Sequence, residues 1–207
     1  MDDLLPQLLE TFPGISTRES LDHPALNLSS TGQLAPLAQT LRKQYGFDLL
    51  VDISGVDWHE QSPRFSVVYH FYSTTGHRYL RIVLDCPDDA APEVPSLAAI
   101  YPTADWHERE TYDMFGIRFT DHPDLRRILM WEKYPYFPLR KDFPLAGIET
   151  ELPDAETNEE LKAGMISAPM MGGPFTAPNK TFLSESEPRA KDQSWSEKKP
   201  KPERSQA

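Results

Sequence analysis

Residues Phe47–Asp85, FDLLVDISGVDWHEQSPRFSVVYHFYSTTGHRYLRIVLD, contain three apolar runs around which a fold can be built. The runs are Phe47–Val56, Arg64–Ser73 and Tyr79–Asp85, and together they are rich in valine, isoleucine, phenylalanine and tyrosine. β-Branched and aromatic residues are enriched in strands, and polar segments such as STTGH are typical of turns. The stretch therefore predicts three strands.

Helical patterns precede these strands. The N-terminal segment MDDLLPQLLETF has an acidic start and paired leucines, which predicts a short amphipathic helix. Residues Gln33–Tyr45 repeat leucine at three- and four-residue spacing and are followed by Gly46, which indicates a helix ended by glycine. Between the two, ISTRES and ALNLS alternate well enough to predict short strands.

Another helical region is expected from near Ser96. Pro102 interrupts it, and Thr103 is placed to cap a second segment that runs to Phe115 and ends at Gly116. The elements alternate between helices and groups of strands. This order predicts a two-layer α+β domain over residues 1–119, with helices packed on one face of a mixed or antiparallel sheet.

The character of the chain changes after residue 119. Pro123, Pro135, Pro138 and Pro144 occur among aromatic and basic residues in DLRRILMWEKYPYFPLRKDFPL. Prolines at this density disfavour a regular helix and favour extended backbone. Residues 120–148 are therefore predicted to form an extended arm rich in proline, aromatic and basic residues.

The last part of the chain, residues 149–207, lacks hydrophobic periodicity. It begins with six acidic residues and no basic residue over Glu149–Glu160, and low-complexity sequence follows. Such a segment does not bury enough apolar surface to order itself alone. We expect this tail to be either disordered or ordered by a partner.

Composition excludes several classes of protein. The 207 residues carry a net charge of −11, whereas nucleic-acid binding requires clustered lysine and arginine. No apolar run approaches the ~20 residues that span a bilayer, and the acidic N-terminus does not resemble a signal peptide. We expect a protein in the cytosol or on the cytosolic side of a membrane, with no nucleic-acid partner.

Cofactor motifs are also missing from the sequence. Cys86 is the only cysteine, which leaves no internal disulfide and no cysteine-based zinc or iron–sulfur site. Neither of the familiar glycine-rich phosphate loops occurs. We therefore expect this chain to bind no cofactor and no metal itself.

The segment Trp106–Gly116, WHERETYDMFG, concentrates charge within an apolar region. On a helix, His107, Glu110 and Asp113 could contribute to a metal or acid–base site, although no second set of ligands is visible. A solvated helix face with an Arg109–Asp113 pair is the plainer interpretation. A third possibility is that these charges meet partner groups in a partly desolvated contact.

Two basic clusters can also be interpreted either as surface groups or as part of an interface. Arg126-Arg127 and Arg140-Lys141-Asp142 are either solvated surface groups or parts of an interface strip. The aromatic residues that flank them favour the interface, because aromatic side chains and arginine contribute most of the binding energy at protein interfaces.

The segment Glu108–Leu129, ERETYDMFGIRFTDHPDLRRIL, resembles the signature of the C subunit of the proton-translocating NADH:quinone oxidoreductase, respiratory complex I. PLRKDFPL, Pro138–Leu145, resembles a second hallmark of this family. Between the hallmarks, Met130–Phe137 departs from the family's usual acidic pair before a tryptophan. Related subunits occur in membrane-bound hydrogenase-type complexes, so an equivalent scaffold there is the alternative, and a metal enzyme using His107, Glu110 and Asp113 is a further one.

The resemblance implies a non-catalytic subunit in the peripheral arm of a larger enzyme, on the cytoplasmic side of a bacterial inner membrane. The complex would hold FMN, iron–sulfur clusters and quinone. This chain would pack against the D subunit, which contributes to the quinone site, and would touch the membrane only indirectly. The residues expected to act as structural and interfacial anchors are Glu108, Arg109, Glu110, Asp113, Gly116, His122, Arg126, Arg127, Pro138, Leu139, Arg140, Lys141 and Asp142.

Overall fold

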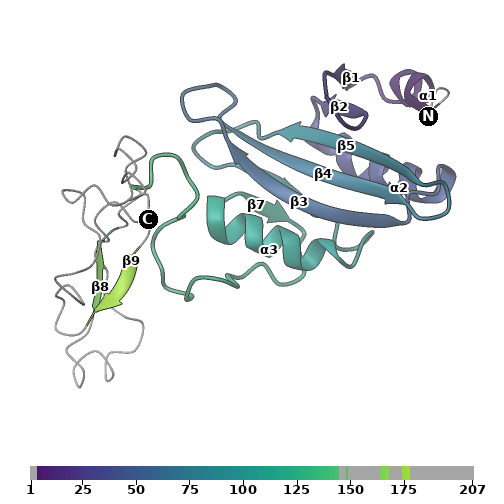
Figure 1. Ribbon diagram of the computed structural model, residues 1–207. Helices are drawn as coiled ribbons and strands as arrows, with labels where there is room; N and C mark the ends of the chain where they lie inside the picture. Colours follow the sequence, from purple (N-terminus) through teal and green to yellow (C-terminus); the bar gives the residue numbers. More distant parts are fainter. Residues whose placement is uncertain (1–3, 145–147, 149–163, 168–173, 178–207) are drawn as a thin grey trace, which may run out of the picture. The chain divides into compact units, whose positions relative to one another are not determined.

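The computed structural model describes residues 4–144, 148, 164–167 and 174–177 (Figure 1). The chain divides into two compact units, Met1–Lys141 and Asp142–Ala207. The arm expected from residue 120 thus belongs to the first unit as far as Lys141. In the second unit, strand β8 (Gly164–Ser167) pairs antiparallel with β9 (Pro174–Ala177), and most of the predicted tail lies outside the described residues.

A five-stranded mixed sheet forms the centre of the first unit. Its strands are β1 (Ile15–Arg18), β2 (Ala25–Leu28), β3 (Leu49–Asp57), β4 (Phe65–Ser73) and β5 (Arg78–Asp85). They lie in the order β1-β2-β5-β4-β3, with β2 and β5 parallel and the other neighbours antiparallel. The three apolar runs thus lie side by side, and β3 is an edge strand.

One face of the sheet is buried. Alternate residues of β4, from Phe65 to Phe71, are fully buried, as the two-residue period of a strand requires. Strand β3 departs from this period, because a register shift between Leu50 and Asp52 puts Leu50 and Ile53 on the same face. Val51, in the bulge, is 42% exposed.

Helices cover the buried face. Helix α1 (Leu4–Thr11), helix α2 (Leu34–Gln44) and helix α3 (Ala104–Phe115) all contribute side chains to one hydrophobic core with the sheet. The Tyr101 hydroxyl donates to the carbonyl oxygen of Phe47 at 2.7 Å, joining the segment before α3 to the start of β3. The prediction of a two-layer α+β domain is confirmed. Within the described residues, no helix has the length and apolar character needed to cross a membrane.

The prediction of a helix beginning near Ser96 is wrong. Residues 96–103 form turns and not a helix, Glu93–Pro95 before them forms β6, which pairs in parallel with β7 (Arg118–Thr120), and α3 begins only at Ala104. The backbone N–H of Ser96 donates to the carbonyl oxygen of Thr120 at 2.9 Å, and a turn follows, in which the N–H groups of Ile100 and Tyr101 donate to the Leu97 carbonyl oxygen at 2.8 Å. Thr103 precedes α3 but does not cap it, because its hydroxyl donates to the Leu50 carbonyl oxygen at 2.9 Å.

Gly116 ends α3 as predicted, in the left-handed conformation with φ of 74°. Its N–H donates to the Tyr112 carbonyl oxygen at 2.8 Å. A Cβ atom at this position would lie 2.6 Å from both Arg140 Nη2 and a ring carbon of Phe137. Glycine is therefore required both for the backbone conformation and for the close approach of the arm.

Substituting Gly116→Ala is expected to lower the free energy of unfolding by at least about 1 kcal/mol, the usual cost of a left-handed alanine. The displaced arm adds to this cost. Gly32→Ala is the matched control, because the nearest atom to a new Cβ there is Ser30 Oγ at 4.0 Å. Urea unfolding of the purified chains measures the free energy of unfolding of both variants. Equal stability of the two would contradict the assigned role of Gly116.

Candidate functional site

Asp113 on α3 anchors the beginning of the arm. Its Oδ2 atom accepts three consecutive backbone N–H groups, from Ile128 at 3.0 Å, Leu129 at 2.6 Å and Met130 at 2.9 Å. Its Oδ1 atom accepts Arg127 Nη1 at 2.5 Å. Burial alone would raise the pKa of Asp113, but these donors outweigh it and hold the pKa below its ordinary value. The carboxylate therefore stays ionised and fixes the turn at residues 128–130.

Arg127 joins three parts of the same region. Besides the Asp113 carboxylate, its guanidinium donates to the carbonyl oxygens of Asp113 and Tyr136, each at 3.0 Å. It also lies 4.9 Å from the ring centre of Phe137. The Arg127 side chain is 8% exposed and that of Asp113 is fully buried, so this is a desolvated ion pair with most of its hydrogen bonds satisfied.

The second hallmark segment is held by contacts to the end of α3. Arg140 Nε donates to the Phe115 carbonyl oxygen at 2.6 Å, and the guanidinium contacts the rings of Phe65 and Phe137. The Leu139 N–H donates to the Met114 carbonyl oxygen at 3.1 Å. These contacts bring the arm back along α3.

Asp57, at the end of β3, completes this attachment. Its carboxylate pairs with Arg64 through two hydrogen bonds of 2.9 and 2.8 Å and also accepts the Lys141 N–H at 2.8 Å. Burial opposes ionisation, but the Arg64 and backbone donors lower the pKa of Asp57 well below its ordinary value. Asp57 was not identified from the sequence. The available signal was a carboxylate placed in register with the buried residues of an apolar strand.

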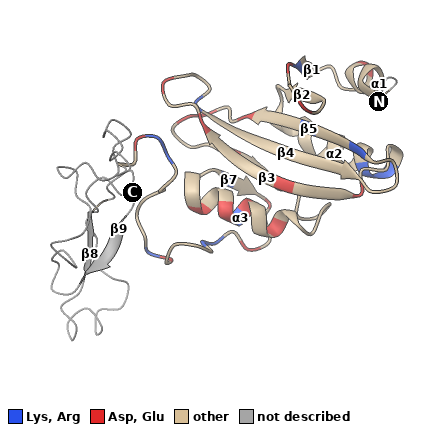
Figure 2. Cartoon of the chain, in the orientation of Figure 1, with Lys and Arg blue, Asp and Glu red and all other residues tan. Residues whose placement is uncertain are grey.

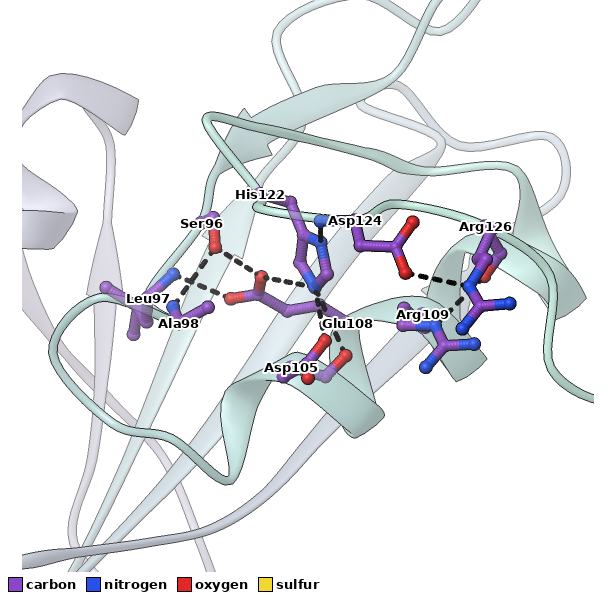
Figure 3. A network of polar contacts seen from close by, with 9 residues as sticks. All are labelled: Ser96, Leu97, Ala98, Asp105, Glu108, Arg109, His122, Asp124 and Arg126. Carbon is purple, nitrogen blue, oxygen red and sulfur yellow. Dashed lines mark hydrogen bonds and ion pairs between the residues drawn. The ribbon is translucent and has the colours of Figure 1, made fainter.

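Glu108 forms a second buried polar network, at the start of α3 (Figure 3). Its carboxylate accepts the Leu97 N–H and the Ser96 hydroxyl, each at 2.6 Å. Burial, with a smaller contribution from the nearby charge of Asp105, raises the pKa of Glu108 to about 7 despite these donors. Glu108 thus holds the segment after β6 in place of the helix expected there.

His122 links this network to the start of the arm (Figure 3). Its Nε2 atom lies 3.2 Å from Asp105 Oδ1 and 3.8 Å from Glu108 Oε2, and its side chain is fully buried. Its Nδ1 atom accepts the Asp124 N–H at 3.0 Å. Because Nδ1 acts as the acceptor, the ring proton resides on Nε2, facing the two carboxylates.

Among the remaining charged residues Arg109 is also buried, and acidic residues recur along α3 (Figure 2). Arg109 Nε donates to the Arg126 carbonyl oxygen at 3.2 Å, and its guanidinium lies 5.1 Å from the Trp106 ring centre. The expected Arg109–Asp113 pair is wrong, because Asp113 pairs with Arg127 instead. Arg126 pairs with Asp124 at an exposed position, and Glu110 is exposed.

The structure changes the interpretation of the buried charges. Glu108 and Asp113 were expected to be structural and interfacial anchors; both side chains are fully buried and are hydrogen-bonded within this chain, so they act as structural anchors here. The structure also does not bring His107, Glu110 and Asp113 together as one group of ligands. Asp113 uses both oxygen atoms within the arm, while His107 Nδ1 lies 3.2 Å from Asp52 Oδ1. The described residues contain no cluster of three or more metal-ligating side chains.

The other expected anchors have separate positions. Pro138 is half-buried beside Leu139, whose side chain is 54% exposed. Lys141 is exposed and takes part through its backbone N–H, while Asp142 is exposed and begins the second unit.

Substituting Asp113→Asn is expected to lower the free energy of unfolding by about 3–5 kcal/mol, the usual cost of breaking a buried ion pair. The new amide would leave Arg127 without its charge partner and would oppose backbone donors. Asp124→Asn is the control, because its pair with Arg126 is exposed and such pairs contribute at most about 1 kcal/mol. Urea unfolding measures the stability of both variants, and proteolysis at residues 128–133 reports release of the turn. Equal stability of the two variants would contradict the anchoring role of Asp113.

Glu108 gives a pH dependence with a defined sign. Its pKa rises on folding from 4.5 to about 7, so its contribution to stability is complete below pH 4.5 and is lost as pH rises through 7. From pH 5 to pH 8, the native chain should lose about 1–3 kcal/mol of unfolding free energy relative to Glu108→Gln. Exposed Glu93 supplies the control Glu93→Gln. If the difference in unfolding free energy between the native chain and Glu108→Gln were the same at pH 5 and pH 8, the titration of Glu108 in this range would be excluded.

Comparison with known sequences gives the family. Residues 29–149 match the family model described as Respiratory-chain NADH dehydrogenase, 30 Kd subunit. The NADH-quinone oxidoreductase C subunit numbered 1 of Rhizobium etli (strain CIAT 652) is 39% identical over 191 residues, which cover 86% of this chain and 94% of that protein. The C subunit numbered 2 of the same strain is 53% identical over 106 residues, and that match spans 51% of this chain and only 56% of that protein.

Solved structures agree on the fold. Nqo5, in a trypsin-resistant fragment of residues 1–134, is 29% identical with a TM-score of 0.50, over 58% of this chain and 98% of the fragment. A chain of the membrane-bound sulfane sulfur reductase, an archaeal respiratory membrane complex, has a TM-score of 0.60 at 20% identity, over 78% of this chain and 91% of that one, and shows the fold alone. The family model and the Rhizobium relative together show that this chain belongs to the 30 kDa subunit family of respiratory-chain NADH dehydrogenase.

Proposed function

We propose that this chain is a non-catalytic structural subunit of the peripheral arm of a proton-translocating NADH:quinone oxidoreductase. One observation supports this role most directly: the charged residues of the signature bind the chain's own arm. Asp113 and Arg127 fix its first turn, and Arg140 fixes its return along α3. Charges used in this way build a rigid shape for a neighbour to contact.

In this proposal the chemistry belongs to other subunits. Electrons from NADH pass through FMN and iron–sulfur clusters to quinone, and none of these groups is bound by this chain. The single cysteine is consistent with this division, because burial raises the pKa of Cys86 to about 12 and disfavours the thiolate that metals require. The chain would pack against the D subunit, at the quinone site, on the cytoplasmic side of a bacterial inner membrane.

Native affinity purification tests the proposal. Tagged chain produced in its own host should recover, from membranes, an assembly that contains flavin and iron and oxidises NADH with a quinone acceptor. The purified chain alone should contain neither group and should not oxidise NADH. Recovery of the chain alone from membranes, or flavin or iron in the isolated chain, would overturn the proposal. Subunits with a nickel site in the assembly would favour the hydrogenase-type alternative.

A charge reversal separates assembly from catalysis. Arg140→Glu places a carboxylate against the Phe115 carbonyl oxygen, which should release the second hallmark segment. The expected result is at least a fivefold lower yield of the assembly, with unchanged turnover per flavin in the assembly that does form. Lys141→Glu is the control, because Lys141 is exposed and its attachment is through the backbone. A normal yield with reduced turnover would indicate a role in catalysis instead.

A further inference from the structure

A groove lies between the edge strand β3 and α3. It has a volume of about 320 Å³ and is open to solvent along one side. Its walls are formed by β3 residues 52–55, by one side of the second half of α3, and by Leu139 of the arm. This volume is near the lower end of the ~300–1,000 Å³ typical of ligand pockets, so the groove has room for one or two side chains.

The shape of the groove is built into both elements. Gly55 allows α3 to approach β3, because a Cβ there would lie 2.6 Å from a Phe115 ring carbon and 3.0 Å from Thr111 Cγ2. The Thr111 hydroxyl donates to the Ile53 carbonyl oxygen at 3.2 Å, and Thr103 binds the Leu50 carbonyl oxygen in the same way. These hydroxyl groups join α3 and the residue before it to two carbonyl oxygens of β3.

The groove combines apolar walls with negative charge. Ile53, Met114, Phe115 and Leu139 supply the apolar surface, and the Leu139 side chain is 54% exposed. The charged groups are Asp52, whose side chain is 43% exposed, and the exposed Glu110. Acidic residues occur on both β3 and α3 (Figure 2). None of the described residues that line the groove is a lysine or an arginine.

His107 contacts only one of these carboxylates. Its Nδ1 atom lies 3.2 Å from Asp52 Oδ1, and the other Asp52 oxygen atom accepts the Ser54 hydroxyl at 2.5 Å. Glu110, one residue beyond Arg109 on α3, lines the groove opposite β3. A cationic group entering the groove would therefore meet two carboxylates at its rim.

We propose that this groove receives a lysine or arginine side chain from a basic segment of a neighbouring subunit. The methylene stem of such a side chain packs on apolar walls while its charged end stays at a polar rim, which matches Phe115 and Leu139 beside Asp52 and Glu110. A charge pair in a partly desolvated contact also fixes the register of two chains. This inference rests on the proposed function, which supplies the neighbouring subunit.

Site-specific photocrosslinking in the intact assembly tests the inference. Leu139→p-benzoylphenylalanine places the reactive group at the groove, and the same change at Leu21, whose side chain is fully exposed in the turn before β2, is the control. After irradiation of the purified assembly, mass spectrometry should find position 139 joined to another subunit within about three residues of a lysine or arginine. Adding Asp52→Asn with Glu110→Gln should lower the crosslink yield at least threefold, and the exposed Glu60→Gln should not.

The alternatives give different products. A crosslink to this chain's own tail, to a second copy, or to a segment without a basic residue would overturn the inference and leave the proposed function standing. An intact assembly with no crosslink at position 139, or a yield insensitive to the two neutralising substitutions, would also overturn it. Failure to recover an assembly with the unmodified chain would overturn the proposed function, and this inference with it.

Discussion

The local structure depends on one buried carboxylate that accepts three consecutive backbone N–H groups and an arginine. Asp113 has no other way to satisfy its charge inside the protein, and the turn at residues 128–130 has no regular secondary structure to satisfy its donors. The carboxylate therefore supplies the acceptors that the turn lacks, and the turn supplies the donors that the buried carboxylate needs. Because Arg127 extends the same network to the Tyr136 carbonyl oxygen, the arm keeps a defined path without forming a helix or joining the sheet.

Two carboxylates on one helix show how burial and hydrogen-bond donors together set the pKa of a carboxyl group. Both Asp113 and Glu108 are fully buried. Asp113 accepts three N–H groups and a guanidinium, and its pKa falls. Glu108 accepts one N–H and one hydroxyl, neither of them charged, and its pKa rises to about 7. The hydrogen-bond donors around Asp113 are sufficient to keep its carboxylate ionised, whereas those around Glu108 do not offset the effect of burial. The first network is thus a permanent ion pair, whereas the second responds to pH.

The sequence predicts the parts of the fold that follow local rules. Strand runs, the helix over residues 34–44 and the glycine that ends α3 all appear where periodicity and capping place them. The prediction of a helix fails at Ser96 and Leu97. Their backbone N–H groups donate to Thr120 and Glu108, which are distant in sequence. Helical spacing pairs Arg109 with Asp113, whereas the actual partner, Arg127, comes from a later loop. Long-range polar partners leave no periodic signal in a single sequence.

The burial of the signature charges changes where a neighbouring chain can bind. A carboxylate already saturated by four internal donors gains little from another cation, so Asp113 can influence an interface only by shaping the arm. The side chains that can meet a neighbour are exposed ones of α3 and the arm, and they include Trp106, Glu110, Leu129 and Leu139. These four combine apolar surface with a carboxylate, which suits a specific contact. In this protein the buried residues of the recognisable motifs build the surface, and exposed residues of the same motifs, together with Trp106, present it.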